Sequence, residues 1–229
     1  MDRIRKKVML ESAKQTIKSA GLYIVPKEKF DYLAEIAADA YRDYPLHCWL
    51  CKGKYDEIMS KLIMKITLRA MKKDAVIYAD GEDMKGFAVW LPPGFTGSKT
   101  IPFMLNGGLR LIFHSGLKVI GRMLSYETYA MKLKRKYTGN EDWYIYNLTV
   151  LHHEQGKGIA SKLLKPMLEY CDRVKTPVYL ETNKEMNVDI YKHFGFEVAL
   201  QGNVPKSDVE HYAMLKKPLT LVIDYEDLC

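Results

Sequence analysis

Cysteine is scarce in this 229-residue chain, and the four that it holds are too few for a disulfide scaffold. Cys48 and Cys51, preceded by His47, have the spacing of a redox pair or of half a zinc site, but no second Cys or His pair with ligand spacing follows. His152 and His153 are adjacent, so in extended chain they point to opposite faces and do not share a metal. We expect buried or half-buried thiols at Cys48 and Cys51 and no metal, with redox or metal chemistry as the minor alternative.

Long apolar runs are also absent. The longest uncharged apolar stretches, around 100–109 and 111–117, fall short of the roughly 20 residues that span a bilayer. The first residues are basic, but only residues 8–10 form an apolar run, which does not match a signal peptide. The sequence therefore predicts a cytoplasmic protein with no membrane partner.

A charge excess is nearly absent beyond the N-terminus. The net charge is +7, and the first twenty residues supply +4 of it, from six Lys or Arg against two acids. A nucleic-acid-binding domain shows a basic stripe over its folded surface, whereas here the charge is concentrated in one terminal helix and in residues 132–136. Solvated helix faces explain this pattern better than a phosphate-backbone site, so we expect no nucleic-acid partner.

What the sequence does hold is a strand, a glycine-bearing turn and a helix in direct succession. Residues 143–150 are aromatic and β-branched without a breaker, which favours a strand. The segment after the turn repeats its apolar residues at three and four, the pattern of an amphipathic helix. Gly156 and Gly158 permit a tight turn and the close approach of a ligand. The positive end of the helix then predicts an anion site that suits a pyrophosphate, at the amides of Gly158, Ile159 and Ala160.

Three kinds of phosphate-binding loop compete for this turn. A Walker loop needs Ser or Thr directly after its Gly-Lys pair, but Lys157 is followed by Gly158. A dinucleotide fingerprint needs its first glycine directly after the strand and a third small residue at Ser161, and five residues intervene here. The third match is Gln155-x-x-Gly158-x-Ala160. It resembles the Arg/Gln-x-x-Gly-x-Gly/Ala signature of the GNAT superfamily of acyl-CoA-dependent acetyltransferases.

A second block supports this resemblance. After a strand pattern at 178–181, the chain has the Asn-x-x-x-Tyr-x-x-x-Gly-Phe spacing that is typical of the superfamily, at Asn187, Tyr191, Gly195 and Phe196. Residues 86–94 resemble the branch that includes puromycin acetyltransferase. The resemblance is firm over 143–197, loose over 26–94, and absent over 100–140 and the first twenty residues.

The resemblance and the alternating patterns imply an α/β fold. We expect a single-domain GNAT-like arrangement with a mixed, mostly antiparallel sheet, central strands splayed around 149–151, and flanking helices. The domain spans 1–229, with an extra N-terminal helix in 1–20 and a helical insertion at 100–140 over the acceptor side. That insertion either extends the core or roofs the acceptor site, and both interpretations stay open. The expected helices are 3–19, 26–40, 55–71, 117–137, 157–173 and 187–194, and the expected strands are 22–25, 75–79, 86–91, 143–150, 178–181, 196–201 and 210–215, with a further short strand in 219–229.

The resemblance also implies a binding site for acetyl-CoA. The diphosphate would lie on the amides of the turn, and the central strand would pair with the pantetheine arm like an added strand. Asn187 would hydrogen-bond that arm, or else cap the helix that follows. The residues expected to contact acetyl-CoA are Leu148, Thr149, Val150, Gln155, Gly156, Lys157, Gly158, Ile159, Ala160, Ser161, Asn187 and Tyr191.

Tyr191 is the expected catalytic residue, because its phenol could protonate the departing CoA thiolate. A plain core tyrosine is the alternative. A base must also take a proton from the attacking amine, and the sequence does not choose among Glu181, Glu127, Asp43 and His114.

The expected function is an acetyltransferase that moves an acetyl group from acetyl-CoA to a primary amine of a small molecule or peptide, by direct attack on the thioester. A CoA-binding regulatory module without turnover and an enzyme that uses a longer acyl-CoA are the alternatives. The expected partners are acetyl-CoA and an unidentified amine acceptor, and a homodimer stays open.

Overall fold

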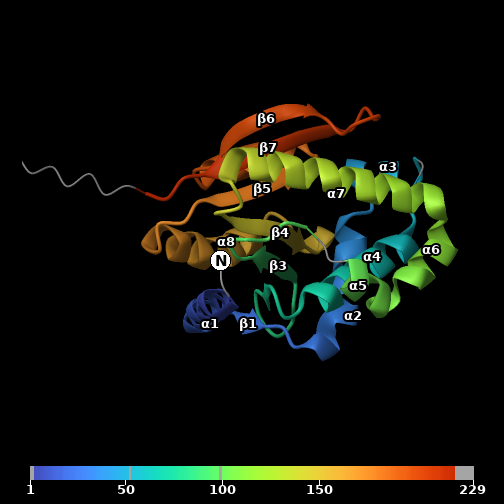
Figure 1. The fold of residues 1–229 in the computed structure, drawn as a ribbon. Helices are drawn as coiled ribbons and strands as arrows, with labels where there is room; N and C mark the ends of the chain where they lie inside the picture. The colour runs from blue at the N-terminus through green and yellow to red at the C-terminus, as the bar shows by residue number, and fades with distance from the viewer. Residues whose placement is uncertain (1–2, 52, 98–99, 220–229) are drawn as a thin grey trace, which may run out of the picture.

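The computed structural model describes residues 3–51, 53–97 and 100–219, and a seven-stranded sheet in the order β1-β2-β3-β4-β5-β7-β6 runs through them (Figure 1). All neighbouring strands are antiparallel except β4 and β5, which are parallel. The prediction of an α/β fold with a mixed, mostly antiparallel sheet is therefore confirmed. The strands are β1 (Tyr23–Ile24), β2 (Val76–Ala79), β3 (Gly86–Leu91), β4 (Trp143–Val150), β5 (Val178–Thr182), β6 (Glu197–Asn203) and β7 (Glu210–Lys216).

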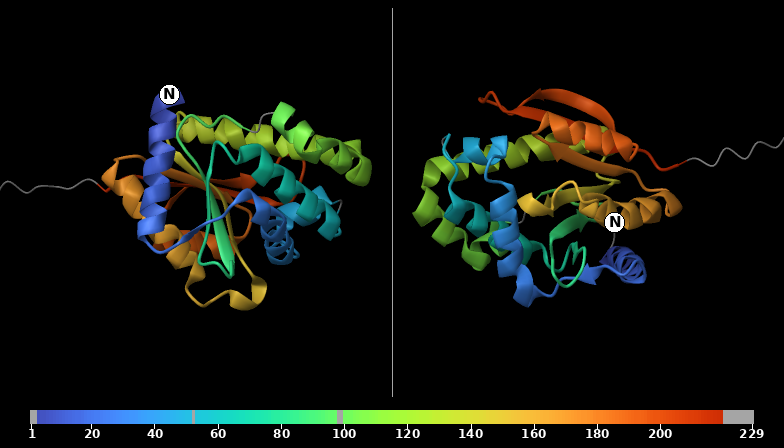
Figure 2. Two further views of the ribbon diagram at one scale, coloured as in Figure 1. Left: turned by 90° about the horizontal axis from the view of Figure 1, so that it is seen from below. Right: turned by 180° about the vertical axis from the view of Figure 1, so that it is seen from behind.

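Helices cover both faces of this sheet (Figure 2). One apolar core lies under α1 and α8, and a second core on the opposite face lies under α2, α4 and part of α7. The helices are α1 (Arg3–Ser19), α2 (Phe30–Ala40), α3 (Pro45–Leu50), α4 (Glu57–Met71), α5 (Thr100–Phe103), α6 (Leu109–Ser115), α7 (Leu117–Thr138), α8 (Ile159–Arg173) and α9 (Glu185–His193), with short turns η1 (Lys27–Lys29), η2 (Met104–Gly108) and η3 (His152–Glu154).

The N-terminal helix is a structural part of the first core. Ala13 and Ile17 on α1 are fully buried, and α1 packs along α8. Burying apolar side chains contributes about 25 cal/mol per Å² removed from water, so this contact stabilises the sheet face that carries α8.

Helix α3 is not predicted in the sequence analysis. The sequence predicts that a helix ends before Pro45, but in the structure another helix begins at Pro45, with the proline in its first turn. Proline is favoured at this position because its missing N–H has no partner in the first turn anyway. The boundary of α4 also shifts, since the Asp56 side chain accepts a hydrogen bond from the Met59 amide at 2.9 Å and starts the helix at Glu57.

One smaller expectation is also corrected. His152 and His153 lie in the turn η3 rather than in extended chain. Cys48 and Cys51 are free and half-buried, as expected. The further strand expected in 219–229 falls almost entirely outside the described residues. No helix in the described ranges is both long and apolar enough to span a bilayer.

The insertion at 100–140 forms α5, η2, α6 and the long α7, as the sequence predicts. Leu111 and Val119 are buried in a third apolar cluster together with Leu46, Leu50 and Ile66 from α3 and α4. The insertion therefore packs against α3 and α4 through this cluster. Figure 1 shows α7 running across β5 and β7, which both contact it.

The central strands separate along part of their length. The parallel pairing of β4 with β5 covers only Trp143 to Ile145, against Val178 to Leu180. On its other side β4 continues to pair with β3 as far as Val150. The predicted splay around 149–151 therefore begins earlier, directly after Ile145, and the second half of β4 has a strand neighbour on one side only.

Candidate active site

The glycine turn, residues 155–158, links η3 to the start of α8. Gly156 and Gly158 have φ values of 78° and 81°, in the left-handed region that side chains other than glycine rarely adopt. No atom lies within 4 Å of the position that a Cβ would take on either glycine, so the outer side of the turn is open. The Gln155 side chain holds the turn from below, donating from Nε2 to the carbonyl of Val150 at 3.3 Å.

Helix α8 begins with an uncapped N-terminus above this turn. Gly158 is its N-cap residue, and no side chain accepts a hydrogen bond from its first amides. These amides carry the positive end of a helix of 15 residues, which favours an anion. Lys157 lies beside them and forms an exposed ion pair with Glu154 at 3.0 Å. The turn therefore offers donors and positive charge to a phosphate group.

A close contact fixes the start of α8 against the sheet. A Cβ on Gly86 of β3 would lie 2.8 Å from Cγ2 of Ile159 and 2.9 Å from the Thr149 carbonyl oxygen. Only glycine permits this approach. As a result the glycine turn lies at the end of the separated half of β4.

Asn187 and Tyr191 face the other side of the separation. Asn187 lies inside the first turns of α9 and donates from Nδ2 to Oγ1 of Thr182 at 3.1 Å, whereas the N-cap residue is Lys184. The alternative role of Asn187 as a helix cap is therefore wrong. Tyr191 is 8% exposed and packs edge-on against Phe196. Burial, together with the nearby phenols of Tyr44 and Tyr41, raises the pKa of Tyr191 well above its ordinary 10, so the hydroxyl keeps its proton at neutral pH.

A cavity of about 330 Å³ opens from this separation toward the helices α3, α4 and α7. Asn147, Leu148, Thr182, Asn187 and Tyr191 form its end at the sheet. The opposite end is apolar and includes Leu50, Ile63, Phe103, Ile120, Met123 and Leu124. Since Phe103 and the last three belong to the insertion, these helices line the cavity as well as extending the core.

Glu181 on β5, next to Thr182, lines the same cavity. Its carboxylate accepts hydrogen bonds from the hydroxyls of Tyr144 at 2.7 Å and Tyr179 at 3.1 Å. Burial raises the pKa of Glu181 from its ordinary 4.5 to about 7, against the opposing effect of the two tyrosines. A carboxylate with this pKa exchanges protons near neutral pH.

A buried ion pair explains why no cation neutralises Glu181. Lys134 on α7 and Asp142 are both fully buried, and their charged atoms lie 2.8 Å apart. Lys134 lowers the pKa of Glu181 and Asp142 raises it, so the two members of the pair act on Glu181 in opposite directions. Lys134 is paired with Asp142, and Glu181 is neutralised by binding a proton instead of by an ion pair.

The other candidate bases lie elsewhere or are weak. His114 is paired with Asp56 at 3.0 Å, and Asp43 is exposed and paired with Lys184 at 3.0 Å; neither lines the cavity. Glu127 does line it, on α7. His47, which the sequence linked only to metal ligation, also lines it, but burial lowers the pKa of His47 to about 4. The tyrosines of the cavity wall, such as Tyr41, Tyr44 and Tyr126, come from separate elements, and no sequence spacing signals that they meet.

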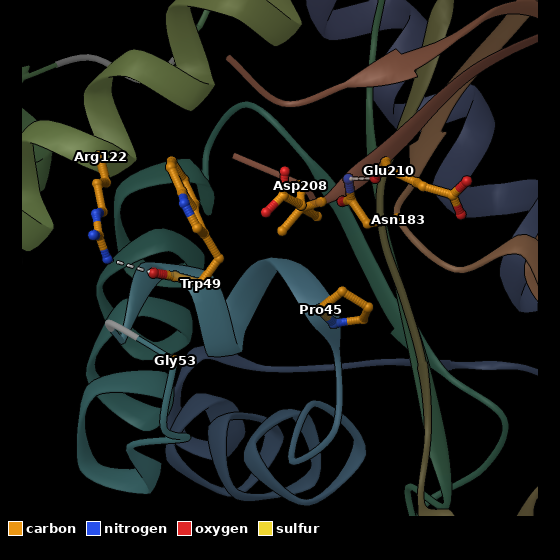
Figure 3. A pocket seen from close by; sticks show the side chains of 8 residues that line it. Pro45, Trp49, Gly53, Arg122, Asn183, Asp208 and Glu210 are labelled. Carbon is orange, nitrogen blue, oxygen red and sulfur yellow. Dashed lines mark hydrogen bonds between the residues drawn. The ribbon is translucent and has the colours of Figure 1, made fainter. Parts of the chain in front are cut away.

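A second, open hollow adjoins the cavity at Asn183 (Figure 3). Its lining includes Pro45 and Trp49 of α3, Arg122 of α7, and Asp208 and Glu210 at the start of β7. Arg122 donates to the Trp49 carbonyl at 2.7 Å, and Asn183 donates from Nδ2 to the Glu210 carbonyl at 2.6 Å, as Figure 3 shows. Among the described residues, no group of three or more His, Cys, Asp or Glu side chains is arranged to hold a metal ion.

Known proteins are similar to this chain in sequence. Residues 130–218 match the model of the acetyltransferase (GNAT) domain. An uncharacterised N-acetyltransferase of Schizosaccharomyces pombe is 27% identical over 187 residues, which cover 75% of this chain and 72% of that protein.

Solved structures share the fold. One from Corynebacterium glutamicum, described as histone acetyltransferase HPA2 and related acetyltransferase, has a TM-score of 0.62 at 17% identity, covering 88% of this chain and 98% of that chain. Arylalkylamine N-acetyltransferase 2 of Aedes aegypti has a TM-score of 0.55 at 19% identity, covering 86% of this chain and 97% of that chain. The matched residues 130–218 contain the separated strands, the glycine turn and α9, so over this part the chain is similar to the acetyltransferase (GNAT) domain.

Proposed function

We propose that this protein is an acyl-CoA-dependent N-acetyltransferase that moves an acetyl group from acetyl-CoA to a primary amine by direct attack on the thioester. The observation that carries this proposal is the position of the glycine turn. Its open amides lie at the end of the separated half of β4, and Tyr191 lines the cavity at the same separation. One site thus combines anion donors, free strand edge and a protonated phenol.

The glycine turn would hold the diphosphate of acetyl-CoA. The donors are the amides of Gly156, Gly158, Ile159, Ala160 and Ser161, with the Lys157 ammonium beside them. These amides have no intrahelical acceptor, so a phosphate satisfies them without breaking any helix hydrogen bond.

The second half of β4 would hold the pantetheine arm. Leu148, Thr149 and Val150 lie where β5 no longer pairs, so their outward backbone groups suit a strand-like ligand. A backbone amide here would also stabilise negative charge on the thioester oxygen in the transition state. The Asn187 amide, on the far side of the separation, would hydrogen-bond the same arm.

Tyr191 would act as the general acid. Its raised pKa keeps the phenol protonated, and its hydroxyl makes no hydrogen bond to another described residue, so it is available to the leaving sulfur. As the C–S bond breaks, the phenol would give its proton to the thiolate.

The names of the solved relatives do not identify the acceptor. One is named for arylalkylamines and the other for histones, and each shares under a fifth of its residues with this chain. We therefore propose only a primary amine at this level and take its chemistry from the cavity below.

Calorimetric titration of the protein with CoA tests the binding part of the proposal. Ala160→Glu places a carboxylate at the start of α8, which is compatible with folding because helix N-termini favour negative charge. It would repel the diphosphate, and we expect at least about tenfold weaker binding, which corresponds to roughly 1.4 kcal/mol. Ala160→Gln has nearly the same size without the charge and reports the steric share of the loss.

Release of CoA thiol from acetyl-CoA in the presence of amines tests the chemistry. Thiol release that depends on the amine supports the enzyme. Tight CoA binding without any amine-dependent release would support a regulatory CoA-binding module instead. Absence of CoA binding to the unaltered protein would refute both.

A further inference from the structure

The lining of the cavity carries information about the acceptor, and this inference depends on the proposed function. Among the described residues that line the cavity, the only acidic side chains are Glu127 and Glu181, and no Lys or Arg lines it. A site without a cation gives no counter-charge to an acceptor that carries a carboxylate or phosphate. A carboxylate or phosphate would be buried here without a positive partner. The free-energy cost of burying an unpaired charge exceeds the gain from contacts with the surrounding apolar side chains.

The end of the cavity away from the sheet is apolar. Phe103, Ile120, Met123 and Leu124 approach it from the insertion, and Leu50 and Ile63 approach it from α3 and α4. A second ammonium group or a peptide backbone at this end would find no polar partner among these side chains. An aromatic ring or a short alkyl chain would instead bury its own apolar surface and that of the cavity wall, which favours binding.

The size of the cavity limits the acceptor to a compact molecule. A volume of about 330 Å³ lies at the lower end of the range for small-molecule sites, which is roughly 300–1,000 Å³. The walls come from α3, α4, the insertion and the sheet, so they contact an acceptor from more than one side.

Glu181 is placed to receive the amine. It is on β5 and lines the same cavity as Tyr191 and as the apolar side chains of the insertion. The hydroxyls of Tyr144 and Tyr179 fix the carboxylate in place. An ammonium beside Glu181 thus has its apolar body toward the insertion and its nitrogen toward the separation of β4 and β5.

We infer that the acceptor is a compact primary amine with an uncharged aromatic or alkyl body, and that Glu181 takes the proton of its ammonium group. The neutral nitrogen then forms a C–N bond with the acetyl carbon, and the C–S bond breaks. A second proton leaves that nitrogen, and one proton reaches the sulfur from Tyr191, which regains a proton from the nitrogen. The first proton passes from Glu181 to solvent.

The titratable groups around Glu181 support proton exchange at this carboxylate. The strands contribute Tyr144, Tyr146 and Tyr179, and α7 contributes Lys134, Tyr126 and Tyr129. Asp142 and Tyr44 complete the set. Burial raises the pKa of these phenols, which therefore stay protonated, and Lys134 is paired with Asp142. The pKa of Glu181 is about 7, so the charge of this carboxylate changes near neutral pH.

Matched pairs of amines test the acceptor chemistry in the thiol-release assay with the unaltered protein. 2-Phenylethylamine is compared with phenylalanine, which adds only a carboxylate, and pentylamine is compared with 1,5-diaminopentane, which adds only a second amine. We expect each apolar member to have the larger kcat/KM, by about 10²-fold or more. Preference for the diamine, for a polyamine or for a lysine peptide would overturn the inference and assign the acceptor to the hollow of Figure 3, whose Asp208 and Glu210 suit a polycation.

The pH dependence of Glu181→Gln and Glu127→Gln tests the base, with the better apolar amine as the acceptor. The unaltered protein is expected to gain kcat/KM as the pH rises through about 7. Glu181→Gln should lower kcat/KM by about 10²-fold or more and remove this rise. Glu127→Gln removes the other cavity carboxylate and should keep it. A rise that persists in Glu181→Gln, or that disappears in Glu127→Gln alone, would overturn the assignment.

Titration with CoA separates this inference from the proposed function. Both variants should keep the CoA affinity of the unaltered protein, because neither residue belongs to the glycine turn. If CoA binds and polar amines are acetylated while apolar ones are not, the proposed function stands and the inference fails. If the unaltered protein does not bind CoA, the proposed function itself fails.

Discussion

The site that we propose has a cofactor half and an acceptor half, and the two are built in different ways. The cofactor half, residues 143–197, is one continuous piece of chain in which strand, turn and helix follow each other directly. The acceptor half is the cavity wall of α3, α4 and the insertion, whose residues lie far apart in the sequence. Within the cofactor half, the proposed phosphate site uses backbone groups, which any side chains permit provided that glycine stands at two positions. The acceptor half uses side chains, and its character depends on each of them.

This difference teaches where specificity can reside. A backbone site binds the same phosphate groups whatever the neighbouring residues are, so it suits a shared co-substrate. A side-chain cavity changes its ligand with each substitution, so it suits the variable partner. Four predictions can break or sharpen this division, and they follow in decreasing order of expected effect.

The largest effect should come from the buried ion pair that supports the acceptor half. Lys134→Met leaves the Asp142 carboxylate buried and without its cation, and we expect a loss of about 3–5 kcal/mol in the free energy of unfolding. Chemical denaturation followed by circular dichroism measures it. Lys134→Met combined with Asp142→Asn should recover much of the loss. If the single variant is as stable as the unaltered protein, the pair does not support this half.

Tyr191→Phe should next affect the cofactor half. The ring keeps its packing against Phe196, but the proton donor is removed, and we expect kcat to fall by about 10²-fold. Steady-state thiol release measures the rate, and calorimetry should show unchanged CoA affinity. Tyr170→Phe is a matched control, because this hydroxyl on α8 donates to the Met9 carbonyl, away from the cavity. Full turnover by Tyr191→Phe would remove the acid from the mechanism.

The third prediction concerns the pH dependence of stability. The pKa of Glu181 is about 7 in the folded protein and near its ordinary 4.5 in the unfolded chain, so folding favours the protonated carboxyl. This contribution is fully present below pH 4.5 and is lost as the pH rises through 7. Glu181→Gln cannot ionise, so the unfolding free energy of the unaltered protein should fall relative to it by on the order of 2 kcal/mol between pH 4.5 and 8. A constant difference between the two proteins would show that Glu181 ionises normally.

The smallest effect should come from an exposed charge at the glycine turn. Lys157 is 58% exposed in its side chain and forms an exposed pair with Glu154. Because water and salt screen such charges, Lys157→Gln should weaken CoA binding only about two- to fivefold. Titrations at low and high salt should show this loss shrinking as the salt concentration rises. A loss as large as that of Ala160→Glu would mean that a side chain, rather than the backbone, dominates phosphate binding.

Much of the fold could be predicted from the sequence where the signals are local. The strand at 143–150 and the helix at 3–19 have the predicted bounds, because an uninterrupted β-branched run and an apolar repeat each indicate one structure. The start of α8 is displaced to Ile159 because Gly158 takes a left-handed conformation at its N-cap. Helix α3 was missed because proline both ends and begins helices, and only the tertiary structure distinguishes the two.

The acceptor half, and the carboxylate of Glu181 that lines the same cavity, could not be predicted in the same way. Glu181 was one of four candidate bases, and its pKa is raised by burial, which exists only in the folded chain. Tyr144 and Lys134 oppose this rise and Asp142 adds to it, and all three reach Glu181 only after folding. The commitment of Lys134 to Asp142 has no local sequence signal. His114 and Asp43 had the right chemistry for a base, but their ion pairs with Asp56 and Lys184 hold them outside the cavity.

The contact at Gly86 has a consequence for how coenzyme A would associate. Because β3 touches Ile159 through a residue without a side chain, the first turn of α8 is already seated on the sheet before any nucleotide arrives. The turn then loses little conformational entropy when coenzyme A binds, so the binding free energy is not reduced by the cost of ordering a loop. Gly86→Ala would push the first turn of α8 away from the sheet. Coenzyme A would then have to order this turn each time it binds.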